Sequence, residues 1–150
     1  MCAPAVTHYV WYKIFTGMTL GDFVHDNSSA AAYEDLTATS LGKFEMGQSY
    51  TMTMKTATDW WRNLSYIAYI DLNADNDFDD YNEMVGSVSA NGNQFNDLTF
   101  TIPTQDVITN KKLTMRIVGH EGGQVTSCNS PRGNYKDISL SIKTGNCMGT

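Results

Sequence analysis

The sequence lacks several features that would point to common protein classes. No run of about 18 apolar residues is present, which excludes a membrane-spanning helix. Charged residues make up only 17% of the 150 residues, the lysines and arginines form no cluster, and the net charge is −6. Nucleic acids and acidic membrane surfaces are therefore poor partners.

Catalytic motifs are also absent. The chain has no nucleophile elbow, phosphate-binding loop or dinucleotide fingerprint, and His120-Glu121 is not followed by the second histidine of a zinc-protease helix. Spacing alone leaves open an acid pair for glycoside hydrolysis. The excess of acidic over basic residues, however, lies in one loop. We therefore expect a protein that is not an enzyme.

Cysteine is scarce, with three residues at Cys2, Cys128 and Cys147. They are too few for a disulfide scaffold, and no two are spaced as a metal or redox pair. Because they lie toward the ends of the chain, we predict a disulfide between Cys2 and Cys128, with Cys147 free. A Cys2–Cys147 bond is the main alternative, and three free thiols are the simplest one. A disulfide would fit an extracellular protein.

Alternation of apolar and polar residues is the dominant pattern that is present, and it predicts half-buried strands. It runs through Tyr50–Lys55, Leu98–Ile102, Leu113–Ile117 and Ile138–Lys143. Leu64–Ile70 is almost continuously apolar, which predicts a strand covered on both faces. Further strands are expected over Tyr9–Phe15, Met18–Phe23, Tyr33–Ala38 and Glu83–Ser89, with glycine- and asparagine-rich turns between the strands.

Roughly eight to ten short strands in one chain of this length predict an all-β fold, a single antiparallel β-sandwich of immunoglobulin-like or jelly-roll-like type. A closed barrel is the second choice. We expect one domain over residues 1–144 and a tail or linker over residues 145–150. Met1 reads as an added start before an excised domain, so we expect the chain to be part of a larger multidomain protein.

The most informative segment is an acidic loop that follows the apolar strand. Six of the 16 acidic residues lie there with no lysine or arginine among them, and the remaining ten acids face ten bases. Oxygen-bearing side chains recur at every second position and are followed by one more acid: Asp71, Asn73, Asp75, Asp77, Asp79 and Glu83. This spacing suits Ca²⁺, which takes six to eight oxygen ligands, and we predict one ion held by these residues.

The loop resembles the calcium loop of EF-hands over its first nine positions, but two positions differ. Asn76 stands where that loop usually has glycine, and asparagine tolerates the left-handed conformation. The closing acid is Glu83 rather than residue 82, and the loop joins two strands rather than two helices. The alternative is a solvated acidic turn without an ion. The mutual repulsion of six neighbouring carboxylates argues against it. Magnesium prefers fewer protein ligands, and zinc would require histidine or cysteine.

The same segment resembles the GEVED domain family of secreted and surface proteins. The match includes Tyr69–Asp80 with Glu83, and similar lead-in and following strands at Met18–Asp22, Tyr33–Thr37, Met46–Met52, Phe100–Pro103 and Leu113–Ile117. At the motif that gives the family its name, this chain reads Gly133-Asn134-Tyr135-Lys136-Asp137-Ile138, so only the glycine and the aspartate remain. Any role of the two lost glutamates is not carried over. The resemblance implies a β-sandwich, an extracellular location and attachment to larger adhesins or secreted hydrolases.

Trp60 and Trp61, just before the apolar strand, carry the alternative function. Exposed tryptophans stack on sugar rings, so the chain could instead be a carbohydrate-binding module; packing of both rings against the sandwich is the structural explanation. Our main hypothesis is a non-catalytic, calcium-stabilised module of a secreted or cell-surface protein with an adhesion, spacer or accessory role. Its partner would be a cell-surface glycan or protein.

Overall fold

Nine strands and no helix occur in the parts of the chain that the structure, a computed structural model, describes: residues 15–26, 33–56, 64–89, 95–121, 127–128 and 133–144. None of these residues belongs to a helix that could cross a membrane. The strands are β1 (Phe15–Leu20), β2 (Phe23–Asp26), β3 (Tyr33–Glu45), β4 (Ser49–Thr56), β5 (Leu64–Ile70), β6 (Met84–Ser89), β7 (Phe95–Thr101), β8 (Leu113–Glu121) and β9 (Gly133–Lys143).

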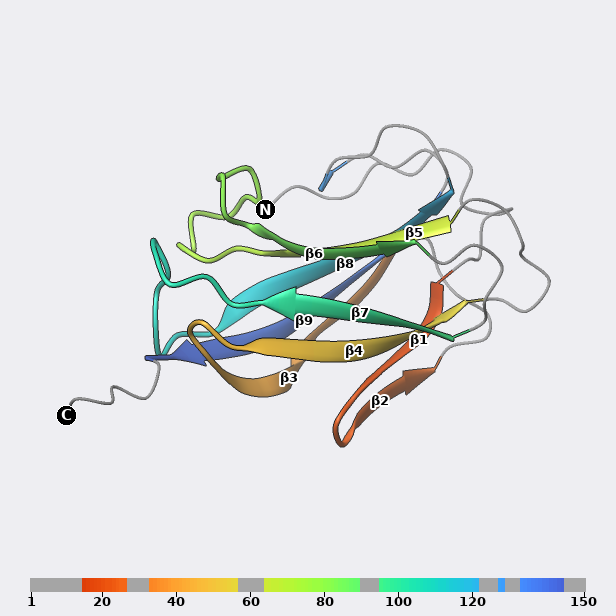
Figure 1. Cartoon of the computed structure of the whole chain (residues 1–150), viewed down its shortest axis with the longest axis horizontal. Helices are drawn as coiled ribbons and strands as arrows, with labels where there is room; N and C mark the ends of the chain where they lie inside the picture. The colour runs from red at the N-terminus through yellow and green to blue at the C-terminus, as the bar shows by residue number, and fades with distance from the viewer. Residues whose placement is uncertain are drawn as a thin grey trace.

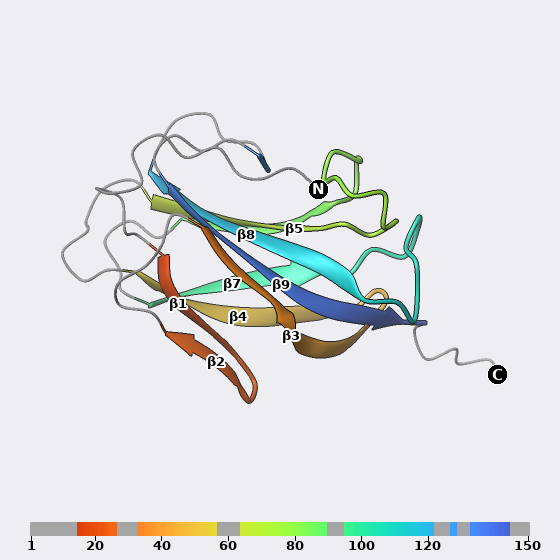
Figure 2. The same ribbon diagram turned by 180° about the vertical axis from the view of Figure 1, so that it is seen from behind.

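Two sheets pack face to face (Figure 1; Figure 2, from behind). One has the order β2-β1-β4-β7 and the other the order β3-β9-β8-β5-β6. The predicted β-sandwich is thus confirmed.

Alternating apolar side chains fill the space between the sheets, as the sequence predicts. Residues from both sheets, including Met52, Met54, Leu98, Phe100, Met115, Ile117, Ile138 and Ile142, are fully buried in one cluster. Where the sheet edges β6 and β7 meet, an added Cβ on Gly86 would lie 2.4 Å from the carbonyl oxygen of Thr99. Only glycine permits this approach of the two backbones.

Two details differ from the expected strands. The pair β3–β9 is parallel within an otherwise antiparallel sandwich, with Tyr33 opposite Tyr135 and Phe44 opposite Ile142. The expected strand Met18–Phe23 is two strands, because Gly21 takes a left-handed φ of 58° and turns the chain from β1 into β2. Of the expected strand Tyr9–Phe15, only Phe15 lies within the described residues.

The outer face of the five-stranded sheet is also covered near β5, which explains the apolar character of that strand. Tyr69, Val118 and Tyr135 form a second buried cluster there with Phe78 from the acidic loop. Beside this cluster the Arg116 guanidinium makes a two-pronged ion pair with Asp137, with Nε–Oδ1 at 2.8 Å and Nη2–Oδ2 at 2.9 Å. The acidic loop therefore rests on a structured surface.

Candidate metal centre

The acidic loop, residues 71–83, is the connection of the β5–β6 hairpin. The Ile70 N–H donates to the Glu83 carbonyl (2.9 Å), and the Asp71 N–H donates to the Thr114 carbonyl of the neighbouring strand β8 (3.0 Å). The loop therefore begins and ends at fixed points of the sheet.

Two apolar side chains anchor the loop between these points. Leu72 is fully buried in the main core, and Phe78 is 4% exposed in the second cluster, 6.0 Å from the Tyr69 ring between centroids. The Arg116 guanidinium lies 5.1 Å from the centre of the Phe78 ring, a favourable cation–π distance. Because the anchors lie on opposite faces of the same sheet, they leave the intervening polar residues little freedom.

Side-chain oxygens shape the backbone between the anchors. Asn73, Asp75 and Asp77 each accept a hydrogen bond from the N–H two residues further on, at 3.3, 3.2 and 3.1 Å. These repeated Asx turns direct alternate side chains to one side of the loop, which is the physical basis of the two-residue spacing in the sequence.

Asp71 and Asn76 complete this backbone shape. The two carboxylate oxygens of Asp71 accept from the N–H groups of Asp75 (3.2 Å) and Asn76 (3.0 Å). Asn76 has a φ of 69°, the left-handed conformation expected at this position, and Ala74 has a φ of 58°, which was not expected. Such conformations are costly for residues with a Cβ and persist where the surrounding contacts impose them.

Four carboxylates converge inside the loop. One oxygen from each of Asp75, Asp77, Asp80 and Glu83 lies within 4.8 Å of the others, and such a group could hold a metal ion. Three of these residues are sequence candidates. Asp80 is an additional one, and the candidates Asp71 and Asp79 lie outside the group, whereas Asn73 is hydrogen-bonded to Asp80.

Asp80 joins the group because the alternation of oxygen-bearing residues ends at Asp79 and a turn follows. The Glu83 N–H donates to the Asp80 carbonyl (3.1 Å) and the Asp80 N–H donates to Glu83 Oε1 (3.3 Å), so residues 80–83 form a turn. Asn73 Nδ2 donates to Asp80 Oδ2 at 2.7 Å. The turn directs Asp80, rather than Asp79, toward the other carboxylates. A turn signal over these residues could have indicated this position.

Burial makes two of the loop acids resist ionisation. It raises the pKa of Glu83 to about 7, although the N–H groups of Leu72 and Asp80 counteract the shift. Burial likewise raises the pKa of Asp71, against the hydrogen bonds from Asn76 and Asp75. In the described residues no lysine or arginine forms an ion pair with Asp75, Asp77, Asp80 or Glu83. A cation would favour their charged forms.

The segment after β7 supports the outer side of the loop. Tyr81 donates through its hydroxyl to Asp106 (2.9 Å), and Asn82 Nδ2 donates to the Gln105 carbonyl (2.7 Å). A cavity of about 340 Å³ lies between the two segments, lined by Asn73, Asp80, Tyr81, Asn82, Asp106, Val107 and Ile108. These bonds tie residues 81 and 82 of the acidic loop to the segment between β7 and β8.

The altered motif at the start of β9 has other partners. Asp137 pairs with Arg116 as described, and the buried Lys136 pairs with Glu34. The Asn134 Oδ1 accepts the Phe15 N–H at 3.2 Å. The residues that replace the two glutamates are thus used in internal contacts of the sandwich.

The tryptophans Trp60 and Trp61, and the cysteines Cys2 and Cys147, lie outside the described residues. The carbohydrate-binding alternative and the Cys2–Cys128 pairing therefore stay predictions.

Comparison with known families agrees with the sequence resemblance. The family model of the GEVED domain matches residues 65–140, half of the chain, from β5 through the acidic loop and into β9. No curated protein matches the chain. The suspected family is thus confirmed, over the segment that contains the four converging carboxylates.

Proposed function

The chain belongs to the GEVED domain family, and on that premise we propose that it is a non-catalytic module of a secreted or cell-surface protein, stabilised by calcium in the β5–β6 loop. Its role within a larger chain would be adhesion, spacing or accessory display, with a cell-surface glycan or protein as partner.

One observation carries the calcium proposal. Four carboxylate oxygens, from Asp75, Asp77, Asp80 and Glu83, lie within 4.8 Å of one another. Like charges at this separation repel, and the repulsion is strongest for Glu83, which is fully buried. A divalent cation turns that repulsion into attraction and offsets the cost of burying the acids.

The chemistry of the donors favours calcium among the common divalent ions. The four side chains offer only hard carboxylate oxygens, which suit Ca²⁺ or Mg²⁺ and not zinc. Calcium accepts six to eight oxygens in flexible geometry, whereas magnesium requires a near-octahedral site and keeps several waters. Carboxylates, each able to bind through one or two oxygens, match calcium better.

The expected gain follows from linkage. Ligands from one continuous loop should give modest affinity, because sites of extracellular modules commonly fall near 10⁻⁴–10⁻³ M and tighter loops reach about 10⁻⁵ M. A site of about 10⁻⁵ M in about 1 mM calcium adds roughly 2.7 kcal/mol of stability, or about 5–10 °C in Tm for a domain of this size. A site of about 10⁻³ M adds only about 0.4 kcal/mol.

The test is a thermal melt in excess chelator against melts in about 10 mM calcium or magnesium, with calorimetric titration of calcium. Calcium should raise the Tm, and magnesium should raise it less. If calorimetry and melting both detect no calcium at that concentration, the loop is an acidic turn and the proposal fails.

Two adjacent residues provide a matched pair of variants. Asp79 and Asp80 are both exposed aspartates, but only Asp80 belongs to the converging group. Asp80→Asn should reduce the calcium-induced rise in Tm, whereas Asp79→Asn should preserve it. The opposite result would place the ion on the ligand set expected from sequence spacing.

A further inference from the structure

A second cavity lies apart from the acidic loop, where β3, β9 and the segment between β7 and β8 meet. Its volume is about 370 Å³, within the range of small-ligand pockets. The lining residues are Ser40, Lys43, Asn110, Lys111, Lys112, Leu140 and Ser141.

The described residues include six lysines, and the three in this cavity differ from the other three. Lys55 pairs with Asp26, Lys136 with Glu34 and Lys143 with Glu45. The other three are Lys43, Lys111 and Lys112, and none of them forms an ion pair within the described parts of the chain. Within the described residues, all three lysines that lack an acidic partner therefore line one cavity, in a protein whose net charge is −6.

Irregular backbone builds the walls of the cavity. The parallel pairing of β3 with β9 shifts register between Leu36 and Ser40 and again between Ser40 and Lys43. Gly42 has a φ of 111° in this bulge, and its N–H donates to Ser40 Oγ at 3.0 Å. The bulge places Lys43 opposite Ser141 of β9. Bulges of this kind reorient side chains and often occur at functional positions.

The other wall is held in a similar way. Asn110 has a φ of 59°, and its N–H donates to the Ile142 carbonyl at 2.8 Å. This bond fixes the segment that carries Lys111 and Lys112 against β9. The bulge in β3 and the left-handed Asn110 thus bring the cationic side chains together. Lysines that served only to protect an edge strand from aggregation would not need to converge in this way.

The lining indicates the chemistry of a ligand. Three cations favour an anionic group, and the two serine hydroxyls and the Asn110 amide add neutral hydrogen-bonding groups around it. We propose that this cavity binds the carboxylate or sulfate group of an acidic polysaccharide, with the sugar hydroxyls contacting Ser40, Asn110 and Ser141.

One observation separates this ligand from nucleic acids. The lining residues that the structure describes include no aromatic ring and no arginine, so they lack the stacking and two-pronged contacts typical of nucleic-acid sites. The exposed Asp35 lies within the influence of this cluster: its pKa is lowered mainly by hydrogen bonds from Thr37 and last by the charge of Lys112. That acid leaves the cluster with a net positive charge.

The test is a titration of the intact chain followed by NMR amide shifts. The probes are oligogalacturonate for the carboxylate, a sulfated oligosaccharide for the sulfate, neutral dextran oligomers, and poly-glutamate. We expect one acidic oligosaccharide to shift the amides of Asn110, Lys111 and Ser141, with affinity that falls as salt increases. The two acidic arms identify which anionic group is recognised.

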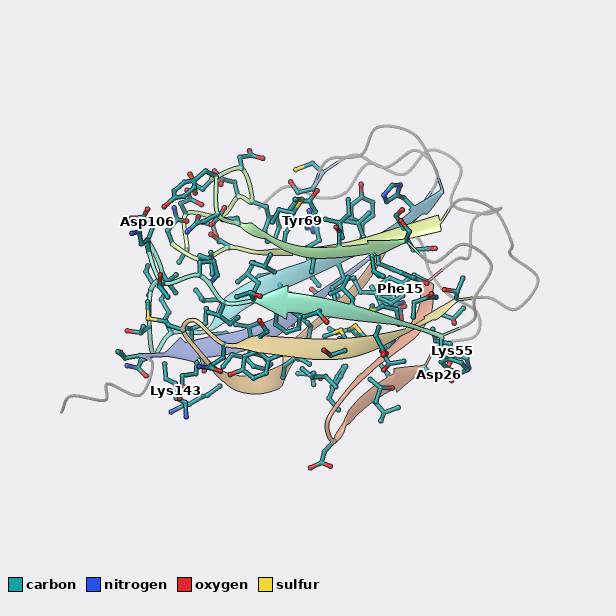
Figure 3. All side chains as sticks on the ribbon, in the orientation of Figure 1. Phe15, Asp26, Lys55, Tyr69, Asp106 and Lys143 are labelled. Atoms are coloured by element: carbon teal, nitrogen blue, oxygen red, sulfur yellow. The ribbon has the colours of Figure 1, made fainter. Side chains whose placement is uncertain are left out.

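Variants distinguish binding at this cavity from nonspecific electrostatic attraction of the ligand to the protein. Lys111→Gln/Lys112→Gln should weaken binding by about four- to twenty-five-fold, because each exposed ion pair contributes a factor of roughly two to five and the two factors multiply. The control Lys55→Gln removes a positive charge at the opposite end of the sandwich from Asp106 and Lys143 (Figure 3) and should change affinity by less than about twofold.

Shifts scattered over the surface, equal binding of dextran, poly-glutamate binding as tight as the acidic oligosaccharides, or an equal loss in Lys55→Gln would each overturn the proposal. Because none of the lining residues belongs to the carboxylate group of the acidic loop, the outcome does not depend on calcium.

Discussion

The ion pair between Arg116 and Asp137 should be the interaction on which the outer face of the five-stranded sheet depends most. The Arg116 and Asp137 side chains are 1% and 3% exposed. Asp137 accepts from Arg116 through both oxygens and also from the Tyr33 hydroxyl at 2.7 Å. Arg116 Nη1 donates to the Ser127 carbonyl at 3.0 Å. Asp137→Asn keeps the shape of the side chain but removes the negative charge that two hydrogen bonds of the buried guanidinium meet.

The expected loss can be worked from this burial. Removing one partner of a buried, hydrogen-bonded ion pair costs about 3–5 kcal/mol, since the remaining charge stays desolvated. For a domain of this size each kcal/mol corresponds to about 2–4 °C. Asp137→Asn should therefore lower the Tm by about 6–20 °C.

The assay is thermal and urea unfolding of matched variants. Asp26→Asn makes the same chemical change in the exposed pair with Lys55, whose side chains are 49% and 32% exposed. That control should cost no more than about 1 kcal/mol. Arg116→Met combined with Asp137→Asn should recover part of the loss, because no unpaired charge remains. A single variant Asp137→Asn no less stable than Asp26→Asn would refute the reasoning.

Three other outcomes can be measured on the same protein. Gly86→Ala should lower the free energy of unfolding by about 1–3 kcal/mol in urea titrations, because its Cβ would meet the Thr99 carbonyl at 2.4 Å; an unchanged value would mean that β6 and β7 separate easily. In chelator, the contribution of the Glu83 carboxyl to the free energy of unfolding is fully present below its ordinary pKa of 4.5 and is lost as the pH rises through about 7. Calcium should therefore stabilise the protein more at pH 8 than at pH 5. Equal effects of calcium at the two pH values would exclude Glu83 as a ligand. Peptide mapping without reductant should recover Cys2 bonded to Cys128, which in the chain-entropy model is worth roughly 4–5 kcal/mol; three free thiols under oxidising conditions would contradict this.

The strands were predictable because their pattern is local. The alternation in Tyr50–Lys55 or Ile138–Lys143 reports which side chains face the core, and the structure places Met52, Met54, Ile138 and Ile142 there. The parallel pairing of β3 with β9 was not predictable in the same way. It joins residues about a hundred positions apart, and neither strand carries a signal for the direction of its neighbour.

The acidic loop was predictable in its location and only partly in its geometry. The oxygen-bearing residues at every second position identified the loop, because Asn73, Asp75 and Asp77 each accept a hydrogen bond from the N–H two residues further on. The inclusion of Asp80 depends on the turn that ends the loop, and the left-handed Ala74 depends on its anchors. The lysine cavity could not be read from the sequence, because a bulge and a distant loop assemble it.

The parallel pair also determines how the sandwich would respond to a pulling force. β9 ends at Lys143 and lies between β3 and β8, with its partners distributed along nearly its whole length. Tension applied through the end of β9 along the strand loads both rows of hydrogen bonds in shear, so that many must break together rather than one after another. Extracting β9 would also expose Ile138, Leu140 and Ile142 from the core. A strand held in this way should therefore resist tension that is transmitted along its axis from a neighbouring segment.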